Sequence, residues 1–220
     1  MTRLDILSDP ICPWCFIGKA RLDAAIAESG HNPFSIRWRI FQLNPDMPHE
    51  GMDRRAYLDA KFGGPAGAAD VYGRIERIAK ADGLAVNFDR IQRTPDTMDA
   101  HRLLRWAEAE ERQGAVSDQL FHRYFVEGED ISDPAVLTEI ARNAGLDAEV
   151  IARLLEGDED RDTLRAEDLE ARRMGVGGVP CFVIGGRYVL QGAQETETWL
   201  RVISEVAEAQ AAMAAETPTP

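Results

Sequence analysis

The sequence predicts an α/β protein in which both ends of the chain contribute strands to one sheet and a long helical segment is inserted between them. The first 41 residues are typical of a β–α–β unit, and the residues after Pro180 are typical of a β–β–α unit. Between these two units the apolar residues recur at helical spacing. Neither terminal unit can cover both faces of its own strands, so we expect the two units to share a sheet.

The N-terminal unit begins with a short, partly apolar strand at residues 4–8. After a turn, a helix is predicted for residues 12–29, and Gly30 suits the left-handed conformation that ends many helices. Residues 34–41 alternate apolar and polar side chains, which is the period of a strand.

The middle of the chain, from residue 53 to about residue 174, is predicted to be helix after helix. Its apolar residues form four stripes of helical period, which contain Ile75, Leu103, Phe121 and Ile140. Two helix starts are predicted where Thr94 and Asp133 each precede a proline, because threonine and aspartate cap helices and proline suits the first helical position.

The C-terminal unit follows Pro180. Residues 181–184 form a wholly apolar run, Gly185 and Gly186 predict a two-residue hairpin turn, and residues 187–190 are the returning strand. A last helix is expected from about Glu195.

These elements predict three regions of the chain. A sheet domain is expected from residues 1–45 together with residues 175–210. An inserted helical domain is expected at residues 46–174, and a flexible tail at residues 211–220.

Charge and composition exclude several classes of function. The formal net charge of the 220 residues is −13, and such an acidic surface repels phosphate backbones and anionic lipids, so we expect neither a nucleic-acid partner nor a membrane partner. No apolar run approaches the roughly 20 residues that span a bilayer. The first ten residues lack the apolar segment of a signal peptide, so we expect a cytoplasmic protein.

Cys12 and Cys15 form a C-x-x-C motif between a predicted strand and a predicted helix. Cys12 there meets unpaired backbone N–H groups and the positive end of the helix dipole, which favour its thiolate form. Cys15 lies one helical turn later, close enough to attack a mixed disulfide on Cys12. Pro13 suits the first helical position, and Trp14 offers an apolar platform beside the sulfur. The motif therefore predicts redox chemistry.

Two other uses of the cysteines are less favoured. A zinc site needs four ligands, and neither Cys181 nor the four histidines supply the missing pair at suitable spacing, so no metal is expected. A cysteine–histidine hydrolase needs a histidine presented to Cys12, which nothing in the sequence provides; a partly buried structural histidine is the preferred interpretation of His101 and His122.

Val179 and Pro180 lead directly into the first C-terminal strand. Active sites of thioredoxin type place an X–Pro peptide opposite the cysteine pair, where a cis bond lets the preceding backbone meet an extended substrate. The alternative is an ordinary trans proline at the first position of a strand. The β–α–β and β–β–α context favours the cis form.

Several segments together resemble one known family. They are residues 8–19 (SDPICPWCFIGK), 41–45 (FQLNP), 100–103 (AHRL), 120–125 (LFHRYF), 175–184 (GVGGVPCFVI) and 192–194 (GAQ), with Tyr188. In this order they resemble the DsbA-like thioredoxin superfamily, and within it the cytoplasmic FrnE-like branch. The resemblance covers nearly the whole chain. One departure is Cys181, where the family usually has an aromatic residue.

The resemblance implies a thioredoxin fold with a large all-helical insertion, Cys12 as the nucleophile, Cys15 as the resolving thiol and Pro180 in cis. It implies a protein disulfide oxidoreductase whose backbone at Val179 aligns the substrate. Its partners would be protein or small-molecule thiols and disulfides. No bound cofactor is expected, although glutathione is a possible redox partner or cosubstrate.

Three questions stay open at this point. A glutathione-dependent isomerase or transferase, of the 2-hydroxychromene-2-carboxylate isomerase or kappa class, is the alternative function, although a serine usually replaces the first cysteine there. A redox-regulated binding protein is a third possibility. Cys181 is expected to be a small buried side chain, and the alternative is a third redox-active thiol near the site.

Overall fold

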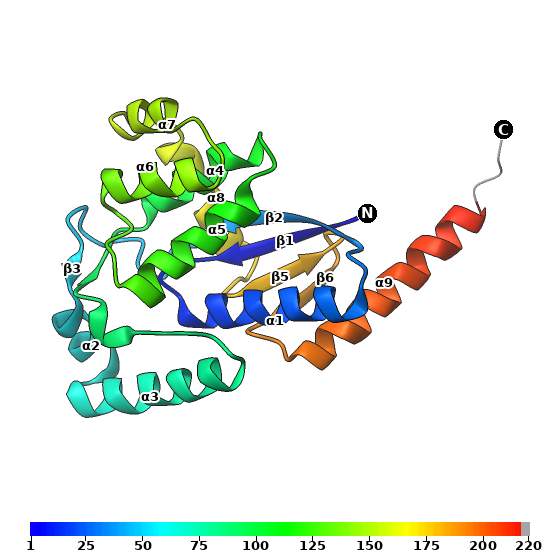
Figure 1. Ribbon diagram of the computed structural model, residues 1–220, viewed down its shortest axis with the longest axis horizontal. Helices are drawn as coiled ribbons and strands as arrows, with labels where there is room; N and C mark the ends of the chain where they lie inside the picture. Colours follow the sequence, from blue (N-terminus) through cyan, green and yellow to red (C-terminus); the bar gives the residue numbers. More distant parts are fainter. Residues whose placement is uncertain (217–220) are drawn as a thin grey trace.

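The computed structural model describes residues 1–216. A four-stranded sheet with the strand order β2-β1-β5-β6 lies at its centre (Figure 1). The strands are β1 (Thr2–Ser8), β2 (Phe34–Ile40), β5 (Cys181–Ile184) and β6 (Tyr188–Gln191). β1 pairs in parallel with β2 and antiparallel with β5, so the two ends of the chain meet in one sheet, as predicted.

Two helices from opposite ends of the chain cover one face of the sheet. They are α1 (Pro13–Ser29) and α9 (Thr196–Glu216), and they pack against each other. Gly30 ends α1 in the left-handed conformation, with φ +65°. Gly185 and Gly186 both have positive φ angles and form the hairpin turn between β5 and β6, as the sequence predicts.

The segment between β2 and β5 is mainly helical. Its helices are α2 (Arg54–Phe62), α3 (Pro65–Ala81), η1 (Phe88–Arg90), α4 (Met98–Glu108), α5 (Gln113–His122), η2 (Arg123–Glu127), α6 (Pro134–Asn143), α7 (Ala148–Leu155) and α8 (Arg161–Arg173). Asp133 caps α6 by accepting a hydrogen bond from the Ala135 backbone N–H, with Pro134 at the first helical position, as predicted.

The prediction for Thr94 is wrong. Thr94 belongs to a two-residue strand, β4 (Arg93–Thr94), which pairs antiparallel with β3 (Met52–Asp53). The next helix, α4, starts four residues later, where the Asp96 carboxylate accepts a hydrogen bond from the Met98 backbone N–H at 3.0 Å. A pairing with a segment 40 residues away outweighed the local preference of threonine for a helix start.

One continuous apolar core joins the sheet to the inserted helices. It contains Leu4 and Phe182 from the sheet, Phe121 and Ile140 from the insertion, and Trp199 from α9. The inserted segment thus completes the core of the sheet rather than forming a separate one. The division of the chain into two domains, residues 1–45 with 175–210 and residues 46–174, stays a prediction.

The flexibility expected for the segment at residues 211–220 stays a prediction. α9 continues through residues 211–216, so the first six residues of that segment are helical, and residues 217–220 lie outside the described part. The alanine-rich sequence here has a high helix propensity, which explains the extension. Gln210 on α9 still donates to Thr2 Oγ1 and to the Pro33 carbonyl oxygen, both at 2.9 Å, and the end of the helix extends away from the body of the molecule (Figure 1).

Candidate active site

The two cysteines of the C-x-x-C motif lie where β1 gives way to α1. Cys12 is the residue that precedes the first turn of α1, and its backbone N–H donates to the Asp9 carbonyl oxygen at 2.9 Å. The backbone N–H groups of Cys15 and Phe16 donate back to the Cys12 carbonyl oxygen, at 3.0 and 3.3 Å. The first turn of α1 itself contains no acidic side chain.

The Val179–Pro180 peptide bond faces Cys12 and is cis, the isomer that the resemblance implies. The Cys12 thiol donates to the Val179 carbonyl oxygen at 3.6 Å. Gly18 on α1 allows this approach, because a Cβ atom there would lie only 3.1 Å from Pro180 Cγ. The Pro180 carbonyl oxygen accepts a hydrogen bond from the Gly192 backbone N–H at 2.8 Å. This bond ties the cis-proline loop to the residue that follows β6.

The two residues between the cysteines have different surroundings. Pro13 occupies the first helical position and is buried. Trp14 is partly buried and packs against the apolar cluster that Ile75 and Ala79 of α3 form with Ile17 of α1. Part of the Trp14 ring therefore holds α3 against α1, and its contact with a substrate stays a prediction.

Both reactive sulfurs are shielded from water. Cys12 exposes 3 % of its surface and Cys15 exposes 2 %. Burial, together with the neighbouring Cys12 sulfur, raises the pKa of the Cys15 thiol well above its ordinary value. Cys15 is therefore protonated at neutral pH while the pair is reduced.

A buried carboxyl group, that of Asp9, lies beneath the cysteine pair. It accepts hydrogen bonds from the backbone N–H groups of Ile11 at 3.3 Å and Leu43 at 2.6 Å. Burial raises its pKa from 3.8 to about 7, although these two N–H groups, the Thr97 side chain and the Lys61 charge oppose the shift. Asp9 thus changes its charge near neutral pH.

His101 is the neighbour of Asp9 in the interior. Its Nε2 atom lies 4.0 Å from Asp9 Oδ1 and has no hydrogen-bond partner in the described part of the chain. Burial lowers the pKa of His101 to about 3, so the ring is neutral at physiological pH. His101 is not presented to Cys12, and the arrangement does not favour cysteine–histidine hydrolysis.

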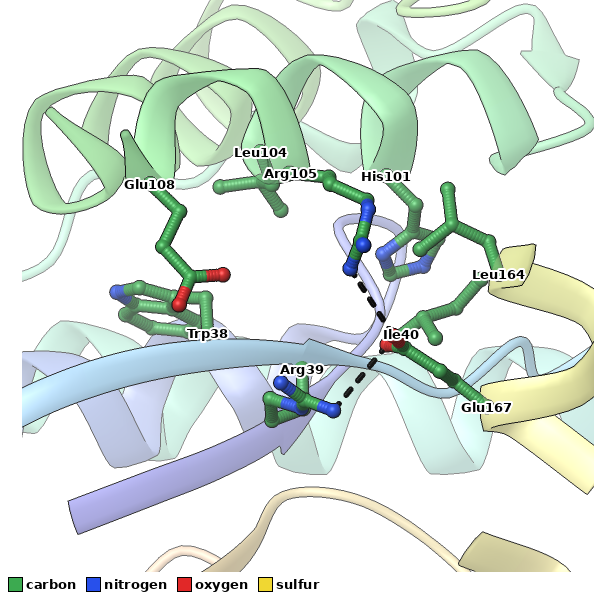
Figure 2. A pocket seen from close by; sticks show the side chains of 9 residues that line it. All are labelled: Trp38, Arg39, Ile40, His101, Leu104, Arg105, Glu108, Leu164 and Glu167. Carbon is green, nitrogen blue, oxygen red and sulfur yellow. Dashed lines mark hydrogen bonds and ion pairs between the residues drawn. The ribbon is translucent and has the colours of Figure 1, made fainter. Parts of the chain in front are cut away.

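Figure 2 shows His101 on α4 beside a small cavity between α4, β2 and α8. Glu167 bridges Arg105 at 2.9 Å and Arg39 at 3.3 Å across this space. The cavity measures about 10 Å³, which is room for about one water molecule. It is too small for a substrate.

Cys181 lies on the opposite face of the sheet from the other two cysteines. Its neighbour Phe182 packs in the core cluster that contains Cys12 and Cys15, whereas Cys181 packs with Leu7 and Ala171. Successive residues of a strand point to opposite faces, so this difference follows from the strand period. Cys181 is fully buried, and burial raises the pKa of its thiol.

A polar cluster made of Lys61 and Tyr57 on α2 and Asn44 in the loop after β2 adjoins the site. The Lys61 ammonium donates to the Tyr57 hydroxyl at 2.5 Å, and the Tyr57 hydroxyl donates to Asn44 Oδ1 at 3.1 Å. Asn44 directly follows Leu43, whose backbone N–H binds Asp9. The exposed cation of Lys61 therefore stands near the loop that supports the cysteine pair.

Neither a metal site nor a membrane-spanning helix is present among residues 1–216. In this range, no group of three or more histidine, cysteine, aspartate or glutamate side chains is suited to hold a metal ion. Within the same range, every helix is too short or too polar to cross a lipid bilayer.

Comparison with known proteins gives a consistent result. A family model described as the DSBA-like thioredoxin domain matches residues 3–204. The crystal structure of a probable DsbA oxidoreductase from Streptomyces coelicolor is 30% identical, with a TM-score of 0.83, and the alignment covers 100% of this chain and 93% of that chain. These findings confirm the predicted thioredoxin fold with its many additional helices.

Two more distant structures share the fold. The cytosolic disulfide reductase DsbM from Pseudomonas aeruginosa, in a structure with GSH, is 23% identical with a TM-score of 0.66, and the alignment covers 96% of this chain and 98% of that chain. A 2-hydroxychromene-2-carboxylate isomerase is 17% identical with a TM-score of 0.67, covering 98% and 100%. At these identities the two structures show the shared fold alone.

The first prediction concerns Asp9 and the pH dependence of stability. The folded-state pKa of about 7 exceeds the unfolded value of 3.8, so between these values the unfolded chain holds fewer protons and stability falls as pH rises. In Asp9→Asn this loss disappears. Relative to wild type, the free energy of unfolding of Asp9→Asn should therefore be about 2–3 kcal/mol higher (a more stable fold) at pH 8 than at pH 5.

The measurement is urea denaturation of the reduced protein, with the thiols kept reduced by a phosphine. His101→Gln provides a comparison of opposite sign, because the lowered pKa of His101 removes stability as pH falls from 6.5 toward 3. Relative to wild type it should gain about 2 kcal/mol at pH 5 compared with pH 7. A constant difference between Asp9→Asn and wild type across pH 5–8 would contradict the interpretation of Asp9.

The second prediction concerns Cys181. Because its sulfur lies across the sheet from the other two, oxidation of the folded protein with diamide should leave Cys181 as a free thiol. Alkylation in denaturant followed by peptide mapping identifies the remaining thiol, and Cys181→Ala should lose the same two hydrogens on oxidation as wild type. A disulfide that contains Cys181 would show that the placement is wrong.

Proposed function

The chain belongs to the DSBA-like thioredoxin domain family, and from this premise we propose that it is a thiol–disulfide oxidoreductase whose reactive pair is Cys12 and Cys15. The observation that carries the proposal is the position of Cys12. Cys12 lies at the start of α1, and its sulfur faces the Val179 carbonyl oxygen. Cys15 follows one helical turn later. Family membership supports thiol–disulfide chemistry in general, and this geometry is the argument for the specific pair.

The proposed reaction has two exchange steps. The Cys12 thiolate attacks one sulfur of a substrate disulfide, so a mixed disulfide forms and the other substrate sulfur leaves as a thiolate that takes up a proton. Cys15 then loses its proton and attacks the Cys12 sulfur. The substrate gains two electrons and two protons, and the pair becomes a disulfide. In the reverse direction the Cys12–Cys15 disulfide oxidises a substrate dithiol.

Substrate binding is assigned to the residues around the Cys12 sulfur. Val179, held by the cis Pro180, offers backbone groups to an extended chain, as in strand addition. Pro13 and Trp14 border the sulfur from the helix side. The exchange requires no bound cofactor. Protein or small-molecule thiols and disulfides are the proposed partners, and a cytoplasmic location suits a dithiol of this kind.

The third prediction tests the proposed pair. Equilibration in glutathione redox buffers, followed by acid quenching, thiol trapping and mass measurement, should reveal a two-electron couple between Cys12 and Cys15. A reduction potential of about −120 mV would indicate an oxidant, and one of about −270 mV would indicate a reductant. Cys12→Ser and Cys15→Ser should each abolish the couple.

If Cys12 and Cys15 form no disulfide with each other at any potential of the glutathione buffers, the oxidoreductase proposal fails. Stable glutathione adducts on Cys12 alone would then favour the alternative.

That alternative is a glutathione-dependent isomerase or transferase. The cluster of Lys61, Tyr57 and Asn44 is the observation in its favour, because it brings donors for a carboxylate beside the loop that binds Asp9 beneath the cysteine pair. Asn44 Nδ2 is buried without a hydrogen-bond partner in the described residues. A resolving thiol at Cys15 argues against this alternative, because isomerisation of a small molecule has no use for it. The same cluster also suits glutathione as a redox partner.

The fourth prediction uses the charge of Lys61. Replacing Lys61 with methionine keeps the length of the side chain and removes the cation, so the KM for glutathione disulfide should rise about three- to fivefold, which is the range of an exposed ion pair. The KM for the uncharged 2-hydroxyethyl disulfide should stay the same. Steady-state kinetics with both disulfides measure the difference.

Lys80→Met is the matched control, because Lys80 is an exposed lysine in the last turn of α3 and is expected to leave both KM values unchanged. An equal rise for the charged and the uncharged disulfide in Lys61→Met would speak against an anion contact.

A further inference from the structure

The end of β1 carries a buried hydroxyl group that no other interaction explains. Ser8 exposes 3 % of its surface, and its Oγ atom has no hydrogen-bond partner in the described part of the chain. A buried hydroxyl without a partner is unfavourable, because it has lost its hydrogen bonds to water and gained none in return. A buried polar group without a partner is uncommon in folded proteins and indicates a bound ligand or a functional role.

The direction of the Ser8 side chain follows from the strand. Leu4, Ile6 and Ser8 alternate with residues of the opposite face, and Leu4 and Ile6 pack in the same core cluster as Cys15. Leu7, in contrast, packs with Cys181 on the other face. Ser8 therefore points to the side of the sheet on which Cys15 lies.

The backbone around Ser8 is fixed. Its carbonyl oxygen accepts a hydrogen bond from the Phe41 N–H at 3.1 Å, and the strand pairs Ser8 with Ile40. The next residue, Asp9, accepts the Cys12 N–H through its carbonyl oxygen. These hydrogen bonds fix the backbone of Ser8 and Asp9 directly before the first turn of α1, in which Cys15 is located.

We propose that the Ser8 hydroxyl and the Asp9 backbone N–H form a hydrogen-bonding pocket for the thiolate of Cys15, and that Ser8 thereby controls the rate at which Cys15 resolves a mixed disulfide. This inference rests on the proposed function. It adds a residue that acts on the second sulfur and leaves the first unaffected.

The electrostatics of Cys15 agree with this geometry. Burial and the Cys12 sulfur raise the pKa of Cys15, and the Ser8 side chain and the Asp9 backbone are the groups that lower it. A thiolate in an apolar interior needs donors, and hydrogen bonds to a charged acceptor are stronger than those between neutral groups. A protonated Cys15 thiol gains least from hydrogen-bond donors. This explains why the Ser8 hydroxyl has no partner while Cys15 is a free thiol.

The step that Ser8 assists is balanced in atoms and electrons. Cys15 gives its proton to a base in the solvent, and its sulfur attacks the Cys12 sulfur of the mixed disulfide. The new bond joins Cys12 and Cys15, the bond to the substrate sulfur breaks, and the substrate leaves as a thiolate that is protonated by water. Ser8 donates a hydrogen bond throughout and transfers no proton.

The fifth prediction separates the two sulfurs by stopped-flow reaction with 5,5′-dithiobis(2-nitrobenzoate). Attack by Cys12 releases the first equivalent of the coloured thiolate, and resolution by Cys15 releases the second. In Ser8→Ala the second phase should be about tenfold slower at pH 7, and its pH profile should move up by about one unit. The first phase should keep the wild-type rate.

Two variants serve as controls. Ser8→Thr retains the hydroxyl and should restore most of the second-phase rate. Ser117→Ala removes a hydroxyl from another buried serine, on α5, and should leave both phases unchanged. Thermal unfolding of the reduced variants confirms that each is folded before its kinetics are compared.

The outcomes are distinct. An unchanged second phase and pH profile in Ser8→Ala would overturn the proposal, and so would an equal slowing of both phases, which indicates a merely structural role. Wild-type protein that releases one equivalent only, with no second phase, would instead overturn the proposed function itself.

Discussion

The buried side chain of Asp9 connects the two loops that leave β1 and β2, and the geometry of the cysteine pair depends on that connection. One carboxyl oxygen receives the Ile11 N–H within its own turn, and the other receives the Leu43 N–H from the loop after β2. The Asp9 carbonyl oxygen receives the Cys12 N–H. Three backbone groups that would otherwise be buried without partners are thus satisfied by one residue, and α1 starts at a defined place.

This connection has an electrostatic consequence. The pKa of Asp9 of about 7 means that burial outweighs the hydrogen bonds that favour the carboxylate. A protonated His101 nearby would compensate a negative Asp9, but burial keeps that ring neutral. Below pH 7 the interior beneath the cysteines is therefore close to uncharged, whereas the acidic residues of the chain lie mainly at the surface. A sulfur that ionises in this interior depends on hydrogen-bond donors rather than on counter-ions.

The sequence allowed the local elements to be predicted and left the long-range junctions unpredicted. The β–α–β and β–β–α units, the helix after Cys12 and the hairpin at Gly185 each have a local pattern, so their boundaries were found within a few residues. The pairing of Thr94 with Met52 and the contact of Asp9 with the Leu43 N–H join segments that no local pattern relates. The position of Ser8 could be predicted only in part. The alternation that starts at Leu4 places it on the buried face, but no local pattern indicates which group it contacts there.

The asymmetry of the two thiols follows from where each lies relative to β1. Cys12 precedes the helix and faces Val179, at the edge where a substrate backbone approaches. Cys15 lies one turn further in, on the side of Ser8, where burial keeps it protonated. In the proposed exchange a substrate therefore meets Cys12 first, and Cys15 attacks only after a mixed disulfide has formed on the neighbouring Cys12 sulfur. The order of the two attacks is a property of the strand–helix junction itself.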